Sequence, residues 1–271
     1  MAHKVWFITG ASRGFGKIWA EAALQRGDLV AATARNPQDL APLVSAHGKT
    51  FLPLALDVTQ RQSVFDAVQR AHAHFGRLDV LINNAGYGQF GAIEELSEDA
   101  VRSQFETNVF GALWVLQAAL PLMRAQGSGH LLSVSSIGGI TAFPNIGIYH
   151  ASKWALEAIN QSLAQEVAPF GLKVTLIEPA GYATDWSGSS AKHATPLAEY
   201  GNMRELAAKR RTAVKPGNPQ ATANAILQLV DAENPPLRFF LGSVCLPIVK
   251  RDYEKRLAEW QAWNAISAAA E

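Results

Sequence analysis

The sequence predicts a single α/β domain spanning residues 1–271, with a doubly wound parallel sheet of seven strands in the order 3-2-1-4-5-6-7. Apolar runs alternate with helical patterns along most of the chain, as they do in repeated β-α-β units with helices on both faces of the sheet. The chain is 48% hydrophobic, and it contains no Pro/Gly/Ser-rich linker that would divide it. Right-handed crossovers then give the strand order.

The individual elements follow from these patterns. We expect strands at residues 4–9, 28–34, 50–56, 78–83, 129–134, 173–178 and 237–241. We expect helices at residues 15–26, 60–75, 98–125, 149–168, 219–231 and 247–263. Thr59 is the expected N-cap of the helix at 60–75. Gly171 is expected to close the chain after the helix at 149–168. A ligand should lie over the carboxyl ends of the strands, which are followed by Gly10, Arg35, Asp57, Asn83, Ser136 and Pro179.

A glycine-rich run, Thr9-Gly10-Ala11-Ser12-Arg13-Gly14-Phe15-Gly16, comes directly after the first strand. Gly10 permits a sharp turn, Gly14 leaves room for a diphosphate, and Gly16 allows the helix to pack closely on the sheet. The helix N-terminus offers free N–H groups and a positive dipole end to an anion. These features are typical of a Rossmann fold, although turns and helix caps also use glycine.

Further polar residues near the carboxyl ends of the strands indicate a catalytic site. Tyr149 and Lys153 lie four positions apart, so they share one face of a helix. A nearby ammonium should lower the pKa of the Tyr149 phenol toward neutrality and allow it to exchange protons, although such a pair can also be merely solvated. Ser136 could polarise a carbonyl oxygen or could be an ordinary turn residue. Asn108 interrupts an apolar helical stretch, which is unfavourable unless its amide or a local distortion is useful.

Together with Asn83-Asn84-Ala85-Gly86, these motifs resemble the classical short-chain dehydrogenase/reductase family over residues 4 to 241. The resemblance implies a catalytic set of Asn108, Ser136, Tyr149 and Lys153, in which Asn108 helps hold a water that links Lys153 to solvent. It also implies contacts to a nicotinamide cofactor from Gly10, Ser12, Arg13, Gly14, Phe15, Gly16, Arg35, Asp57, Val58, Asn84, Ala85, Gly86, Tyr149, Lys153, Pro179 and Thr184. The run 236–242 resembles the carbonyl reductase, hydroxysteroid dehydrogenase and retinol dehydrogenase subgroup.

The end of the second strand favours NADP(H) over NAD(H). It reads Ala34-Arg35-Asn36 and carries no acid to bind the ribose hydroxyls of NAD. Arg35 and Arg13 could bind the 2′-phosphate of NADP instead, or they could be ordinary surface charges. After the sixth strand, Ala180 stands where the family has a glycine.

The segment from about 182 to 217 is expected to be irregular and to act as a substrate-covering lid, with a passive surface insertion as the alternative. The expected substrate-pocket residues are apolar or aromatic, unless they pack on the core instead: Phe143, Ile146, Tyr182, Trp186, Tyr200 and Met203. Such a lining favours an apolar ketone or aldehyde. We therefore expect NADPH-dependent carbonyl reduction, with a non-catalytic NADPH-binding redox sensor or a same-fold epimerase or dehydratase as alternatives.

The C-terminal extension at about 243–271 is predicted to form an amphipathic helix. Its Tyr253, Leu257, Trp260 and Trp263 could cover the substrate mouth or a partner subunit. The family commonly pairs through helices equivalent to 98–125 and 149–168, which implies a homodimer or homotetramer.

Charge and cysteine content exclude several other classes. The formal net charge is +1 with mixed signs, so we expect neither a nucleic-acid partner nor a membrane partner. The histidines show no metal-ligand spacing, we expect no metal, and His150 is expected to neighbour the site. The single Cys245 cannot form an internal disulfide and is expected to be a buried, inert thiol. With no signal peptide before the first strand, the expected location is the cytoplasm.

Overall fold

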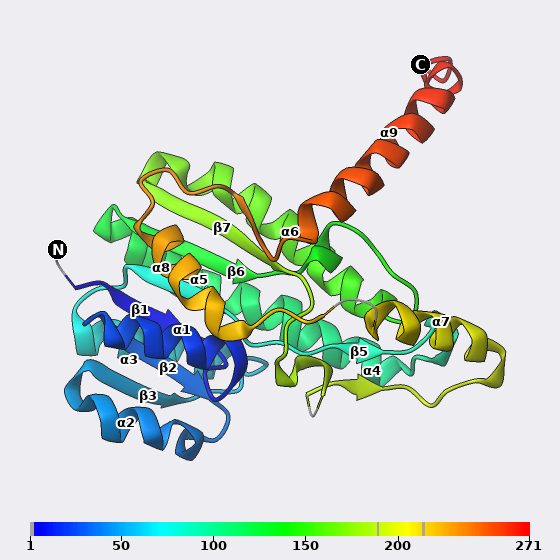
Figure 1. Cartoon of the computed structure of the whole chain (residues 1–271). Helices are drawn as coiled ribbons and strands as arrows, with labels where there is room; N and C mark the ends of the chain where they lie inside the picture. The colour runs from blue at the N-terminus through cyan, green and yellow to red at the C-terminus, as the bar shows by residue number, and fades with distance from the viewer. Residues whose placement is uncertain (1–2, 189, 213–214) are drawn as a thin grey trace.

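Seven parallel strands form the main sheet of the computed structural model, which describes residues 3–188, 190–212 and 215–271. Their order is β3-β2-β1-β4-β6-β7-β9 (Figure 1). The bounds are Val5–Ile8 for β1, Leu29–Ala34 for β2, Phe51–Ala55 for β3, Val80–Asn83 for β4, Gly129–Val134 for β6, Leu172–Pro179 for β7 and Arg238–Leu241 for β9. Counted along the main sheet alone, this is the predicted order, and the predicted fold class is confirmed.

Helices cover both faces of this sheet (Figure 1). One layer contains α1 (Gly14–Gln25), α2 (Ala41–His47) and α8 (Thr222–Asp231), and the other contains α3 (Arg61–Phe75), α5 (Ala112–Gln126) and α6 (Gly147–Val167). Successive side chains of a strand point to opposite faces. Trp6 of β1 therefore belongs to the core cluster under α1, and its neighbour Phe7 belongs to the cluster under α3.

The predicted helix at 98–125 is divided in three. It consists of α4 (Glu98–Phe105), a π-helical segment at Glu106–Gly111, and α5. Asn108 lies in the π-helical segment, where the widened turn relieves the cost of an asparagine in a helix. The sequence indicated that this residue needed a reason to be there, but it did not place the distortion.

Two further differences from the predicted elements appear. Helix α2 was not predicted. The segment 182–217 is not irregular throughout, because it contains a 3₁₀ turn at Asp185–Ser187, strand β8 (Lys192–His193) and helix α7 (Gly201–Thr212). Residues 189, 213 and 214 of this segment lie outside the described residues. Strand β8 pairs in parallel with β5 (Gln89–Phe90) in a small second sheet.

Local capping agrees with prediction at one helix end and differs at another. Gly171 has φ +72° and ends the 3₁₀ turn that follows α6, as expected. The N-cap of α3 is Gln60, not Thr59. The Thr59 hydroxyl instead donates to Asp57 Oδ1 at 2.8 Å, so it stabilises the turn after β3.

Helix α9 (Cys245–Ala268) projects away from the domain (Figure 1). Its side chains Tyr253, Leu257, Trp260 and Trp263 are 44%, 49%, 58% and 61% exposed. The suggestion that they cover the substrate mouth of their own chain is therefore wrong. None of the helices within the described residues has the length and apolar character needed to cross a membrane.

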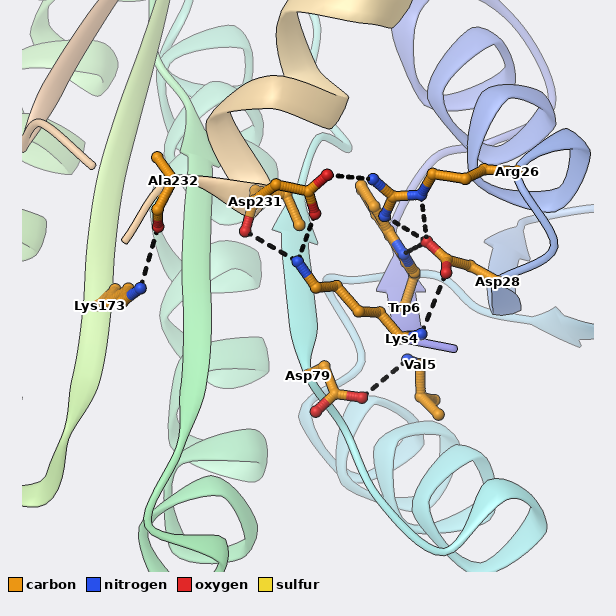
Figure 2. Close-up of polar contacts among 10 residues, drawn as sticks. Lys4, Val5, Trp6, Arg26, Asp28, Asp79, Lys173, Asp231 and Ala232 are labelled. Atoms are coloured by element: carbon orange, nitrogen blue, oxygen red, sulfur yellow. Dashed lines mark hydrogen bonds and ion pairs between the residues drawn. The ribbon is translucent and has the colours of Figure 1, made fainter. Parts of the chain in front are cut away.

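A network of ion pairs and hydrogen bonds closes the amino edge of the sheet (Figure 2). Asp28 is buried, and its carboxylate accepts hydrogen bonds from the Lys4 backbone N–H at 3.0 Å and the Trp6 indole at 2.8 Å. Arg26 pairs with both Asp28 and Asp231, joining α1 to the end of α8. Charged groups therefore stabilise this edge, and its buried acid, Asp28, is paired with Arg26.

Candidate active site

A large pocket opens at the opposite, carboxyl edge of the sheet. Its volume is about 2370 Å³, and its walls come from the segments that follow the seven strands of the main sheet. The predicted catalytic and cofactor residues that line it are Gly10, Ser12, Arg13, Gly14, Phe15, Arg35, Asp57, Val58, Asn84, Ala85, Gly86, Ser136, Tyr149, Lys153, Pro179 and Thr184. Among the described residues, Gly16 and Asn108 do not line the pocket but lie behind its wall.

The glycine-rich loop has the shape of a phosphate cradle. Gly10 and Gly14 have φ values of +66° and +56°, which side chains other than glycine rarely adopt. A Cβ on Gly16 would lie 2.5 Å from the Gly10 carbonyl oxygen, so only glycine permits this close approach. A Cβ on Gly14 would enter open space in the pocket. The Asn84 amide holds the loop by donating to the carbonyls of Thr9 and Gly10, both at 2.9 Å.

Two cationic side chains border the same cradle. Arg13 is the N-cap residue of α1, and Arg35 comes directly after β2. Both are exposed and line the pocket. The acid nearest along the pocket wall, Asp57, accepts from the backbone N–H of Thr59 at 3.0 Å and so belongs to its own turn. The residues present therefore fit a dinucleotide with its phosphates over the helix N-terminus.

Tyr149, Lys153 and Ser136 meet at the centre of the pocket. The Lys153 ammonium donates to the Val134 carbonyl at 2.7 Å and lies 5.7 Å from the centre of the Tyr149 ring. The Ser136 hydroxyl accepts from the Gly138 backbone N–H at 3.0 Å, which fixes the short turn after β6. The same hydroxyl lies near enough to the Tyr149 phenol to oppose a rise in its pKa.

Electrostatics at this centre differ from the expected pattern. Burial raises the pKa of Tyr149 to about 12, and the hydrogen bond with Ser136 opposes that shift. Burial also lowers the pKa of Lys153 to about 8, opposed by the charge of Glu157. The expected lowering of the phenol's pKa toward neutrality is not seen in this arrangement, because burial outweighs the effect of the Lys153 ammonium, which is bound to a backbone carbonyl. Tyr149 stays protonated at neutral pH.

Asn108 braces the pocket from behind. Its Nδ2 donates to the Tyr87 carbonyl at 3.0 Å and to the Ser152 hydroxyl at 3.1 Å, while its Oδ1 accepts from the Tyr87 N–H at 3.2 Å. A Cβ on Gly86 would lie 3.1 Å from Asn108 Oδ1 and 3.7 Å from Lys153 Nζ. Asn108 therefore ties the segment after β4 to helix α6 beside Lys153.

The substrate side of the pocket is mainly apolar. Of the six predicted residues, those that line it are Phe143, Ile146, Tyr182, Trp186 and Met203. The Trp186 ring lies 4.9 Å from the Tyr149 ring between centres, so this part of the segment 182–217 packs against the tyrosine. Tyr200 is not among the described lining residues, and its hydroxyl donates to Glu94 Oε2 at 2.6 Å instead. The Thr184 hydroxyl caps the lid turn by accepting from the Trp186 N–H at 3.4 Å.

Sequence reasoning missed another part of the lining. The missed residues lie after β4, on the small sheet, on α7 and at the start of α9: Tyr87, Phe90, Lys192, His193, Leu206, Val244, Pro247, Ile248 and Arg251. No motif marks them, because long-range pairing brings them together. His150 also lines the pocket, as expected of a neighbour of the site, and its Nδ1 lies 2.9 Å from the Gly138 carbonyl. Burial lowers the pKa of His150 to about 4 and keeps the ring neutral.

Cys245 is a buried, free thiol at the start of α9. Burial raises its pKa to about 11, so it is not a thiolate at neutral pH. This confirms the expected inert thiol.

A comparison with protein families decides the affiliation of the chain. The model of the short chain dehydrogenases matches residues 4–195. The protein is a short-chain dehydrogenase. Over 98% of this chain and 99% of the relative, the sequence is 41% identical to oxidoreductase BOA17 of Botryotinia fuckeliana. It is also 37% identical to 3-ketodihydrosphingosine reductase of Bacteroides thetaiotaomicron, over 89% of each chain.

Among solved structures, a short-chain dehydrogenase from Streptomyces avermitilis matches this short-chain dehydrogenase with a TM-score of 0.92 and 38% identity. The match covers 100% of this chain and 99% of the other. Structures of the same fold have been solved in complex with NADP and with NAD. The protein is thus an oxidoreductase of this family, and the site fits a nicotinamide cofactor.

Proposed function

We propose that this short-chain dehydrogenase reduces an apolar ketone or aldehyde to an alcohol with NADPH, and that the reaction is reversible. The observation that carries this proposal is a buried, protonated Tyr149 that lies with Ser136 in the pocket beside the glycine-rich loop, with the Trp186 ring packed against it. A keto-substrate reductase among its relatives supports the same chemistry. On this proposal the protein falls with the carbonyl reductases and the hydroxysteroid and retinol dehydrogenases.

The side chains divide the work as follows. A bound nicotinamide supplies the hydride. The Ser136 hydroxyl orients and polarises the substrate carbonyl oxygen, and the Tyr149 phenol gives its proton to that oxygen. The Lys153 ammonium stabilises the phenolate that remains and holds the nicotinamide ribose. Asn108 keeps Lys153 and the neighbouring chain in place, while Trp186 and the other apolar side chains exclude water.

The proposed preference for NADPH rests on Arg13 and Arg35 beside the cradle and on the absence of an acid at the end of β2. Arg35→Ala should weaken NADPH binding by about 1.5–3 kcal/mol, the worth of a hydrogen bond to a charged group, and leave NADH binding almost unchanged. Fluorescence titration with each cofactor measures this difference. Arg70→Ala, on the exposed side of α3, is the matched control. Equal losses for both cofactors would show that Arg35 supports the fold rather than the phosphate.

Two other functions remain open on the same fold: a non-catalytic NADPH-binding redox sensor, and an epimerase or dehydratase that recycles its cofactor. A panel of ketones and aldehydes, monitored for NADPH oxidation and for product, separates them. Reductive turnover supports the proposal. Tight NADPH binding without any turnover would favour the sensor, and product without net NADPH oxidation would favour the epimerase or dehydratase.

We also propose a homodimer or homotetramer in the cytoplasm. The exposed aromatic side chains Phe110 and Trp154 lie on the helices through which the family commonly pairs. A single buried thiol is compatible with a reducing compartment. Light scattering and cell fractionation test the two statements.

A further inference from the structure

A pair of buried carboxyl groups lies immediately behind Lys153 and has no part in the mechanism above. Glu157 follows Lys153 by one turn on the same face of α6. Glu178 is next to the end of β7, and its side chain is 0% exposed. Arg238, at the start of β9, donates from Nε to Glu157 Oε2 at 3.0 Å and lies 3.5 Å from Glu178 Oε1.

The oxygens of this pair need a proton. Within the described residues, Glu157 Oε1 and both carboxyl oxygens of Glu178 are buried without a donor of full hydrogen-bond geometry. An ionised carboxylate can only accept, and two neighbouring carboxyl groups do not both stay ionised when buried. One shared proton removes the repulsion between the two carboxylates and supplies a donor for one of these oxygens. In agreement, burial and then the charge of Glu157 raise the pKa of Glu178 to about 9.

The guanidinium decides which of the two carries the negative charge. Arg238 makes its hydrogen bond with Glu157 and has only a longer contact with Glu178. Apart from Lys153, the other groups around the pair are neutral: Ser135 directly follows β6, and the Cys245 thiol at the start of α9 donates to the Glu178 carbonyl. The charge therefore rests on Glu157, and the proton rests on Glu178.

Glu157 is also the acid one turn beyond Lys153 on α6, and it acts on the ammonium through its charge rather than through a direct ion pair. The remaining groups around the ammonium are the Val134 carbonyl of β6, Asn108 of the π-helical segment and Tyr149, all uncharged at neutral pH. Burial lowers the pKa of Lys153, and the charge of Glu157 opposes this shift.

We propose that Glu157 is a positioning residue that keeps the Lys153 ammonium charged, and that Glu178 retains the proton of the pair so that the negative charge stays on Glu157. The loop that carries Ser136 is built to admit this pair. A Cβ on Gly139 would lie 2.5 Å from Ser135 Oγ and 3.2 Å from Glu157 Oε1. The test has two measurements, a kcat–pH profile and the pH dependence of cofactor binding, and only the kcat–pH profile rests on the proposed reductase function.

The test replaces Glu157 by Gln, which keeps the shape of the side chain and removes its charge. The alkaline limb of the kcat–pH profile should move to lower pH by roughly one unit, the size of shift that one nearby charge produces. The second measurement needs no turnover. Binding of NADPH or NADH, followed by fluorescence between pH 6 and 9.5, should weaken at a correspondingly lower pH in Glu157→Gln, because Lys153 holds the nicotinamide ribose.

The matched control is Glu178→Gln, in which a neutral amide replaces a neutral carboxyl group. Its kcat and cofactor-binding profiles should stay within about 0.3 pH units of the wild type, well inside the effect of one charge. Glu157→Asp keeps the charge, and the alkaline limb of its kcat–pH profile should lie between those of the wild type and Glu157→Gln. If Glu157→Gln does not fold, as judged by circular dichroism, the contrast between Glu157→Asp and Glu178→Gln decides the question.

Two results would overturn the inference. In the first, the alkaline limbs of the kcat–pH and cofactor-binding profiles do not move in folded Glu157→Gln. In the second, these limbs shift further in Glu178→Gln than in the Glu157 variants. Failure of the proposed function looks different. The wild type would then turn over no ketone or aldehyde, while the pH dependence of cofactor binding would still report on Glu157 and Lys153.

Discussion

The two edges of the sheet treat buried acids in opposite ways. At the amino edge, Asp28 is paired with Arg26 and accepts hydrogen bonds from a backbone N–H and an indole (Figure 2). At the carboxyl edge, Glu157 and Glu178 share a single guanidinium and leave carboxyl oxygens without donors among the described residues. An acid with matched donors stabilises a fold, whereas incompletely paired buried groups cost stability and are typical of sites that do chemistry. The paired groups at the amino edge therefore stabilise the sheet, whereas the incompletely paired groups at the carboxyl edge lie beside the candidate active site.

The largest effect should come from the carboxyl edge. Tyr149→Phe removes the proton donor and should lower kcat by at least ~10²-fold, while the cofactor affinity and the free energy of unfolding change little. Steady-state kinetics with a ketone substrate and urea denaturation measure both. Tyr253→Phe on the exposed helix α9 serves as control. Near-wild-type turnover of Tyr149→Phe would refute the assignment of the acid.

The amino edge should show the reverse behaviour. Asp28→Ala leaves the Trp6 indole and a backbone N–H without their acceptor and removes one of the two partners of Arg26, so the free energy of unfolding should fall by about 2–3 kcal/mol. The kcat of the folded variant should be unchanged. Asp66→Ala on the exposed face of α3 should change stability by less than about 0.5 kcal/mol. A large loss of kcat in folded Asp28→Ala would mean that the two edges are not independent.

The lid should control selectivity rather than stability. Trp186 packs on Tyr149, so Trp186→Ala enlarges the pocket beside the acid. We expect the ratio of kcat/KM between bulky and small ketones to rise about tenfold, with NADPH affinity nearly unchanged. Trp263→Ala, at an exposed site on α9, is the control. An unaltered ratio would place the selective contacts on α7 and the first turn of α9.

The smallest effect concerns alkaline stability. Because the pKa of Glu178 is raised to about 9 in the folded chain, this carboxyl group stabilises the fold fully below its ordinary pKa, and that contribution is lost as the pH rises toward 9. Glu178→Gln stays neutral and avoids the loss. Its Tm should exceed that of the wild type by about 2–4 °C near pH 8.5, and the difference should shrink toward pH 5. Thermal unfolding across this pH range tests the trend, and a difference that does not vary with pH would contradict it.

Much of the site was predictable because its residues are local in sequence. The glycine-rich loop follows a buried strand, and the spacing of Tyr149 and Lys153 on one helix places both side chains on one face. Parallel strands bring their carboxyl ends to one edge, so Arg35, Ser136 and Thr184 could be assigned to one pocket. The order of the main sheet followed from the same alternation of strands and helices.

Other features depended on contacts that no local pattern contains. Helix α7 and strand β8 lie in the segment 182–217, which has weak hydrophobic periodicity and was therefore predicted to be irregular. Strand β8 is fixed by its pairing with the distant β5. Tyr200 has the aromatic character of a pocket residue, yet its hydroxyl bonds Glu94, more than a hundred positions away in the chain. Residues at the start of α9 enter the pocket only because β9 ends beside β7.

The sequence by itself determined the strand order and the position of the glycine-rich loop, and it led to the proposal of Tyr149 as proton donor, because chain periodicity, glycine positions and helical spacing are properties of neighbouring residues. The tertiary structure alone decided the direction in which the pKa of Tyr149 shifts. Burial raises the pKa of Tyr149, while the Lys153 ammonium that was expected to lower it binds the Val134 carbonyl. It also brought Glu157, Glu178 and Arg238 from α6, β7 and β9 into one buried cluster. Desolvation and charge pairing depend on which distant segments surround a group, and only the folded chain specifies them.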